Sequence, residues 1–180
     1  MLYFLYAVLL FVVLMIPVFI WSLLALMAGR IRGGNLVLEG CKVWADIWFF
    51  CVGIYHINHF EEPLKKGASY IFIANHISYL DAAIIPKAFR QPVRPLGKVE
   101  LSKVPIFGFI YKNAIVSVDR SSPANRARSV QQLKSILRKG ISVLVFPEGT
   151  FNLTHRPLKD FYDGAFRIAI ETGTPIRPVL

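Results

Sequence analysis

A histidine and an aspartate lie five residues apart in the polar segment 75–81, Asn-His-Ile-Ser-Tyr-Leu-Asp. An imidazole can act as a general base, and a carboxylate bonded to it can fix its orientation, so His76 and Asp81 are a candidate catalytic pair. Two other histidines precede an acidic residue at the same spacing, His155 before Asp160 and His56 before Glu61. Only His76 directly follows an apolar run typical of a buried strand, and this setting favours it over the other two.

An alternative role for Asp81 is purely structural. Ser78 stands where the N-cap of a following helix is expected, and Ser78-x-x-Asp81 fits a capping box. In that role the Asp81 carboxylate would only bond to main-chain N–H groups at the helix start. The residues by themselves leave both roles open.

Other polar groups follow apolar runs in the same way. Glu148, Gly149 and Thr150 come directly after the most apolar run of the body, 141–146. A carboxylate, a hydroxyl and a glycine that permits close backbone approach suit a ligand with hydroxyl or phosphate groups. The alternative for this segment is a simple tight turn.

Two basic residues are candidates for binding an anion. Arg120 lies beside an expected helix start, where a guanidinium and main-chain N–H groups can bind a phosphate together. Lys98 could add a point charge. The alternative for both side chains is an ordinary solvated surface.

The elements that must position these residues alternate from residue 69 onward. Apolar runs predict strands and capping signals predict helices: strands at 69–74, 114–118, 141–146 and 176–180, helices at 79–89, 122–139 and 161–172. This order predicts an α/β fold with a largely parallel or mixed sheet flanked by helices. Ligands bind at the carboxyl ends of strands in such sheets, which is where the candidate residues are expected.

The N-terminal segment differs sharply from the rest of the chain. Of residues 1–29, 26 are apolar and none is charged, so the whole net charge of +10 lies in residues 30–180. A helix of this length can span a hydrocarbon core of about 30 Å. A secretory signal is the rival, but it would have basic residues first and a shorter apolar run. Basic residues follow the segment instead, which predicts that the remainder of the protein lies in the cytoplasm.

A second apolar stretch, 41–57, is interrupted by Lys42 and Asp46. It suits either a helix at the membrane surface or a core helix of the body, and the sequence does not choose between them. The predicted organisation is therefore a membrane anchor at 1–29, a membrane-proximal helical segment at 30–68 and an α/β domain at 69–180.

Four segments, in this order, resemble the glycerophospholipid acyltransferase family, in particular its lysophosphatidic acid acyltransferase branch. They are NHISYLD at 75–81, KVEL and VDRS between 98 and 122, FPEGT at 146–150 and TPIRPVL at 174–180. Together they extend from about residue 70 to the end of the chain. Their order, behind a membrane anchor, is more specific than any one of them.

The resemblance implies transfer of a fatty acyl chain from acyl-CoA or acyl-carrier protein to the free hydroxyl of lysophosphatidic acid. His76 would take the proton of that hydroxyl, and Asp81 would orient the imidazole. Lys98, Arg120 and the segment 148–150 would hold the glycerol and phosphate of the acceptor. The resemblance implies neither a covalent acyl-enzyme nor a metal or bound cofactor.

The chain departs from the family pattern in two respects. Phe151 and Asn152 follow FPEGT where family members usually have Arg or Ser, and Asp163 precedes Gly164 where Lys is frequent. The chain also stops at the fourth segment, so the catalytic domain is expected to be incomplete at its C-terminus.

Other functions stay open from the sequence. They are acyl transfer to another lysolipid or to an aminolipid, hydrolysis of a lipid by the same histidine, and non-enzymatic binding to anionic membrane lipids. Nucleic acid is not an expected partner.

Overall fold

The computed structural model describes residues 1–89, 91–119 and 121–180. The chain forms two compact units, each described here by itself. One contains Met1–Glu62, Ala82–Arg90 and Glu100–Ala114, and the other contains Pro63–Asp81, Gln91–Val99 and Ile115–Leu180. The domain boundaries predicted after residues 29 and 68 stay predictions.

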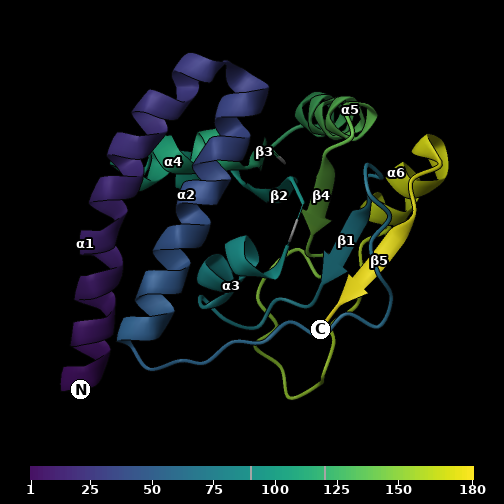
Figure 1. The fold of residues 1–180 in the computed structure, drawn as a ribbon. Helices are drawn as coiled ribbons and strands as arrows, with labels where there is room; N and C mark the ends of the chain where they lie inside the picture. Colours follow the sequence, from purple (N-terminus) through teal and green to yellow (C-terminus); the bar gives the residue numbers. More distant parts are fainter. Residues whose placement is uncertain (90, 120) are drawn as a thin grey trace. The chain divides into compact units, whose positions relative to one another are not determined.

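The first unit begins with a hairpin of two long helices (Figure 1). Helix α1 (Leu2–Ala25) continues into a 3-10 turn, η1 (Leu26–Ala28), and α2 (Arg30–Cys51) then runs back along it. Gly29, at the turn, has a φ of 83°, which glycine adopts without a steric penalty. A Cβ at Gly33 would lie 2.5 Å from the carbonyl oxygen of Ala25. Glycine at this position therefore lets the two backbones approach closely next to the turn.

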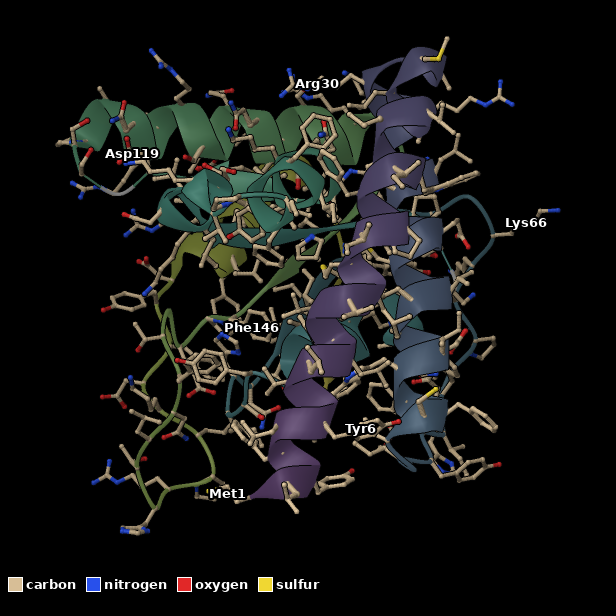
Figure 2. The ribbon with its side chains drawn as sticks, turned by 90° about the vertical axis from the view of Figure 1, so that its left-hand side faces the viewer. Met1, Tyr6, Arg30, Lys66, Asp119 and Phe146 are labelled. Atoms are coloured by element: carbon tan, nitrogen blue, oxygen red, sulfur yellow. The ribbon has the colours of Figure 1, made fainter. Side chains whose placement is uncertain are left out.

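Polar groups of aromatic side chains join the two helices along their length. Indole N–H and phenol O–H groups donate to main-chain carbonyls of the facing helix: Trp48 to Ala7 at 2.9 Å, Trp44 to Phe11 at 3.4 Å, Trp21 to Leu36 at 2.7 Å and Tyr6 to Cys51 at 3.2 Å. Tyr6 is labelled in Figure 2. These bonds satisfy donors that would otherwise be costly in an apolar surrounding. The stretch 41–57 is thus helical as far as Cys51 and packs against α1.

The surface of α1 is mostly apolar and open. In the described part of the chain, Leu2–Ala28 is the one helix long and apolar enough to cross a membrane, and most of its side chains are not covered by protein. Large exposed apolar surfaces are unfavourable in water and mark contacts with lipid or with a partner. This helix indicates that the protein associates with a membrane.

Two short helices and a 3-10 turn accompany the hairpin. Their bounds are Asp81–Ala88 for α3, Val99–Lys103 for η2 and Phe107–Ala114 for α4. Helix α4 contacts both α1 and α2, and the ring centroids of Phe19 and Phe109 lie 5.4 Å apart. Lys87 of α3 pairs with Asp46 of α2.

The second unit is built on a five-stranded parallel sheet (Figure 1). Its strands are β1 (Ile71–Ala74), β2 (Val93–Lys98), β3 (Val116–Val118), β4 (Ser142–Val145) and β5 (Ile176–Val179). The strand order is β3-β2-β4-β1-β5, and all pairings among the described residues are parallel. The predicted α/β class is confirmed, and the sheet is parallel throughout rather than mixed.

Helices α5 (Pro123–Arg138) and α6 (Gly164–Thr172) pack against this sheet and form its main apolar core. The core residues come from both the strands and the helices: Ile71, Val116, Leu133, Leu137, Val143, Val145, Ala165 and Ile168. The capping signals predicted for α5 and α6 are confirmed. Ser122 Oγ accepts the N–H of Asn125 at 3.1 Å before Pro123, and Gly173 ends α6 with a φ of 63°.

Strand β2 and helix α4 are not expected from the sequence. Arg94 and Pro95 lie within β2, and a charge and a residue without an N–H both argue against a central strand. In the structure Pro95 pairs with Leu144 of β4, and Arg94 is buried, which lowers the pKa of its guanidinium to about 10.

Candidate active site

The candidate site lies at the carboxyl ends of β1 and β4, within the second unit. These strands are neighbours, with Ile71 beside Val143 and Ile73 beside Val145. The segments that follow them therefore leave the sheet side by side. Phe146, labelled in Figure 2, is the first residue after β4, and His76 follows β1 after Ala74 and Asn75.

The structure brings His76 and Asp81 together. His76 Nδ1 lies 2.7 Å from Asp81 Oδ2, and about a fifth of each side chain is exposed. A proton held on Nδ1 by this carboxylate leaves the lone pair on Nε2 available to accept a proton. Among the described residues, no such bond joins His155 to Asp160 or His56 to Glu61.

The carboxylate of Asp81 also bonds to the main chain of the turn before α3. The N–H of Ser78 donates to the same Oδ2 at 3.3 Å, and Ser78 Oγ accepts the N–H of Leu80 at 3.1 Å. This carboxylate therefore bonds both to the imidazole and to the N–H of Ser78, which is one half of the expected capping box. The bond from Ser78 helps to hold the Asp81 carboxylate beside the imidazole.

Two phenyl rings pack on the imidazole of His76. The ring of Phe146 is stacked at a centroid distance of 4.0 Å and that of Phe151 is tilted at 4.1 Å. Both rings pack against the imidazole at stacking distance and so restrict its rotation. Tyr79 packs edge-on against Phe151 at 4.7 Å. Sequence reasoning missed these supporting rings, although Phe146 and Phe151 flank the segment that it singled out.

The main chain of His76 is held by the segment after β4. Its N–H donates to Glu148 Oε1 at 3.3 Å, and its carbonyl accepts the N–H of Asn152 at 2.6 Å. The second oxygen of Glu148 accepts the N–H of Lys159 at 3.4 Å, and the residue is only 2% exposed. The predicted substrate contact of Glu148 is untested, and in this structure both its oxygens bond to main-chain N–H groups.

Gly149 and Thr150 complete this segment. The N–H of Gly149 donates to the carbonyl of Phe146 at 3.0 Å, and its φ of 73° requires glycine or a strained residue. The backbone is thus the tight turn that was the alternative reading of the segment. Thr150 Oγ1 accepts a hydrogen bond from Lys159 Nζ at 2.9 Å.

The sequence model of the acyltransferase family matches residues 56–180. This chain belongs to the acyltransferase family. It is 34% identical over 124 residues to the probable 1-acyl-sn-glycerol-3-phosphate acyltransferase of Mycoplasma pneumoniae, an alignment that covers 66% of this chain and 46% of the relative. It is 30% identical over 182 residues to the 1-acyl-sn-glycerol-3-phosphate acyltransferase of Limnanthes douglasii, covering 94% and 61% respectively. The chain spans about half the length of the curated relatives that it matches.

A solved structure has the same fold. The crystal structure of the 1-acyl-sn-glycerophosphate (LPA) acyltransferase PlsC from Thermotoga maritima matches with a TM-score of 0.74 at 21% identity. The match covers 96% of this chain and 71% of that one. The fold described above is therefore shared with that protein.

Of the two basic residues that the sequence predicts as phosphate ligands in this acyltransferase family member, the structure describes only one. Lys98 is the last residue of β2, which neighbours β4, and it lies three residues beyond Pro95, the partner of Leu144. It is thus at the same edge of the sheet as the candidate site. Arg120 lies outside the described residues. The binding roles of both stay predictions.

The described ranges of this acyltransferase family member contain no cluster of three or more histidine, cysteine, aspartate or glutamate side chains suited to a metal. The expectation that neither a metal nor a bound cofactor takes part stays a prediction.

Proposed function

We propose that this protein transfers a fatty acyl chain from a thioester donor, acyl-CoA or acyl-carrier protein, to the free hydroxyl of lysophosphatidic acid. The observation that carries the proposal is the bonded pair of His76 and Asp81 at the carboxyl edge of a sheet, in a member of the acyltransferase family. Relatives named as 1-acyl-sn-glycerol-3-phosphate acyltransferases support this choice of acceptor.

In this reaction His76 acts as the general base. Asp81 accepts the N–H of Nδ1, and Nε2 takes the proton from the acceptor hydroxyl as its oxygen attacks the thioester carbonyl. The tetrahedral intermediate then collapses, the C–S bond breaks, and the leaving thiolate takes the proton from the imidazolium. The acceptor oxygen is itself the nucleophile, so no acyl-enzyme forms.

Asp81 stabilises the imidazolium that forms during the attack. The phenyl rings of Phe146 and Phe151 keep the imidazole in one orientation. Preorganisation of this kind matters because a misplaced base loses much of its effect. No metal or bound cofactor has a part in the proposed reaction.

We also propose that the apolar helix α1 holds the enzyme at the membrane, where its lipid acceptor and product reside, with residues 30–180 on the cytoplasmic side. The supporting feature is the pair Arg30 and Arg32, which directly follows the apolar segment. Addition of a protease to one side of sealed vesicles would test the orientation.

The test of activity uses membranes that contain the full chain, a labelled acyl donor and lysophosphatidic acid. His76→Ala should lower the rate of transfer by about 10²–10⁴-fold, the usual contribution of a general base. His155→Ala is the matched control, because it removes a histidine at the same spacing from an aspartate and should keep the rate. Full activity of His76→Ala would refute the mechanism.

The same assay separates the alternative functions. A lipid hydrolase would release free fatty acid at the same rate with and without the acceptor. A non-enzymatic module would bind anionic vesicles, lose that binding as salt rises, and be indifferent to His76→Ala. A panel of lysolipids and aminolipids would show whether another acceptor is used better than lysophosphatidic acid.

A further inference from the structure

A cavity of about 420 Å³ lies beside the candidate base, within the second unit. Its lining includes Glu148, Thr150, Arg156 and Lys159. Glu148 also holds the main-chain N–H of His76, so the cavity and the segment carrying the base share a wall. The cavity therefore adjoins the segment that carries the candidate base.

Two basic side chains enter the lining from the segment between β4 and α6. Lys159 is fixed at both ends, because its N–H donates to Glu148 Oε2 at 3.4 Å and its Nζ donates to Thr150 Oγ1 at 2.9 Å. Its ammonium has three donors, and the bond to Thr150 uses one of them. Two N–H bonds are left for a ligand in the cavity.

The segment that contains Arg156 is held by hydrogen bonds among its own residues. Its carbonyl accepts a bond from Asn152 Nδ2 at 2.9 Å and its N–H donates to Thr154 Oγ1 at 3.2 Å. Thr154 in turn donates to Asn152 Oδ1 at 2.6 Å. The backbone of Arg156 is therefore fixed, while its guanidinium forms no hydrogen bond or ion pair with any residue that the structure describes.

The cavity also contains negative charge, which limits what it can bind. The carboxylate of Glu148 is committed to two main-chain N–H groups, whereas Asp160 lines the cavity and opposes an anion. A guanidinium, an ammonium and a threonine hydroxyl on one wall match the oxygens of a phosphate monoester better than those of a singly charged group.

We propose that Arg156 and Lys159 bind the phosphate monoester of the acceptor in this cavity, with Thr150 as a third ligand. This inference rests on the proposed acyl transfer to lysophosphatidic acid. It assigns the phosphate to the segment after the turn at Gly149, so the cations come from outside the four segments singled out in the sequence. The inference also predicts that Asp160 weakens binding of the acceptor, because its carboxylate adds a negative charge to the lining of the cavity.

The experiment measures steady-state kinetics of the full chain with lysophosphatidic acid. Arg156→Gln and Lys159→Gln should each raise the KM for the acceptor about tenfold or more, since each loses charged hydrogen bonds, and should leave kcat nearly unchanged. Asp160→Asn should lower the same KM. The matched controls are Arg138→Gln and Lys139→Gln, two exposed cations at the end of α5, which should change neither constant.

Two results would overturn the assignment. One is a KM for the acceptor that is the same in the cavity variants as in the controls. The other is a rise in KM confined to acyl-CoA, which would place a phosphate group of the donor in the cavity. Transfer to lysophosphatidic acid by the wild type, in either case, would leave the proposed function standing.

Binding of a short-chain lysophosphatidic acid to the detergent-solubilised full chain gives a measurement that needs no turnover. A weaker Kd in Arg156→Gln and Lys159→Gln, with the Kd of the controls unchanged, supports the site even if the wild type transfers acyl chains to a different acceptor. Equal Kd values in all variants refute it.

Discussion

Replacing Glu148 with glutamine should loosen the segment that carries the base. Both carboxylate oxygens accept N–H bonds, from His76 at 3.3 Å and from Lys159 at 3.4 Å, in a residue that is 2% exposed. An amide keeps only one acceptor oxygen and turns an NH₂ group toward the second N–H. A hydrogen bond to a charged group contributes about 1.5–3 kcal/mol, and a buried unsatisfied donor costs about 1–3 kcal/mol.

Both bonds are long, so the low end of these ranges applies, and we expect a loss of about 2 kcal/mol in the free energy of unfolding. For a chain of this size that corresponds to a fall in Tm of about 4–8 °C. The kcat for acyl transfer should fall with it, because His76 loses a main-chain support, whereas the KM for the acceptor should change little.

The assay combines thermal unfolding of the detergent-solubilised chain with steady-state kinetics. Glu171→Gln is the control, since Glu171 is half exposed and pairs with Lys134 at the surface, where an ion pair contributes about 0–1 kcal/mol. If Glu148→Gln keeps the Tm of this control and raises only the KM, the carboxylate contacts substrate and the positioning argument is refuted.

Three further predictions concern other parts of the molecule. Asp81→Asn should lower kcat by about 10²–10⁴-fold, because the imidazole loses the carboxylate that fixes its tautomer; an unchanged kcat would contradict the pairing. Gly33→Ala should destabilise the helical hairpin by about 1–3 kcal/mol through overpacking against Ala25, whereas Gly164→Ala, with nothing within 4 Å of its Cβ, should not lower the Tm. Burial lowers the pKa of His56 from its ordinary value of 6.5. The folded state therefore binds fewer protons than the unfolded state as the pH falls through 6.5, and stability falls with it. His56→Gln should reduce that loss, measured as Tm between pH 7 and pH 5.

Much of the fold follows from local patterns in the sequence. Apolar runs of about four to six residues mark the strands β1, β3 and β4, and the caps at Ser122 and Gly173 mark ends of α5 and α6. Strand β5 is predicted at 176–180 as well, although Arg177 and Pro178 lie within it. Strand β2 lacks such a pattern, because Arg94 and Pro95 interrupt it. It forms because β3 and β4 lie on either side of it, and neighbours of that kind leave no local signal.

The candidate site was predictable only in part, for a related reason. His76 and Asp81 are close in sequence, so spacing and a helix start were enough to pair them. The bond from Glu148 to the His76 N–H depends on β1 lying next to β4, and local patterns do not determine that strand order. Phe151 was evident only as a departure from the family pattern, and its packing on the imidazole again requires the two strand ends to meet.

The hydrogen bond between His76 and Glu148 joins residues that are 72 positions apart in the chain. A ribosome that adds about 5–20 residues per second needs about 4–14 s to go from one to the other. The helical hairpin, by contrast, is complete by Cys51 and depends on contacts between helices that are adjacent in sequence. During synthesis the protein can therefore reach its membrane well before its base is held in place, and we expect a nascent chain that is already attached to lipid but still inactive.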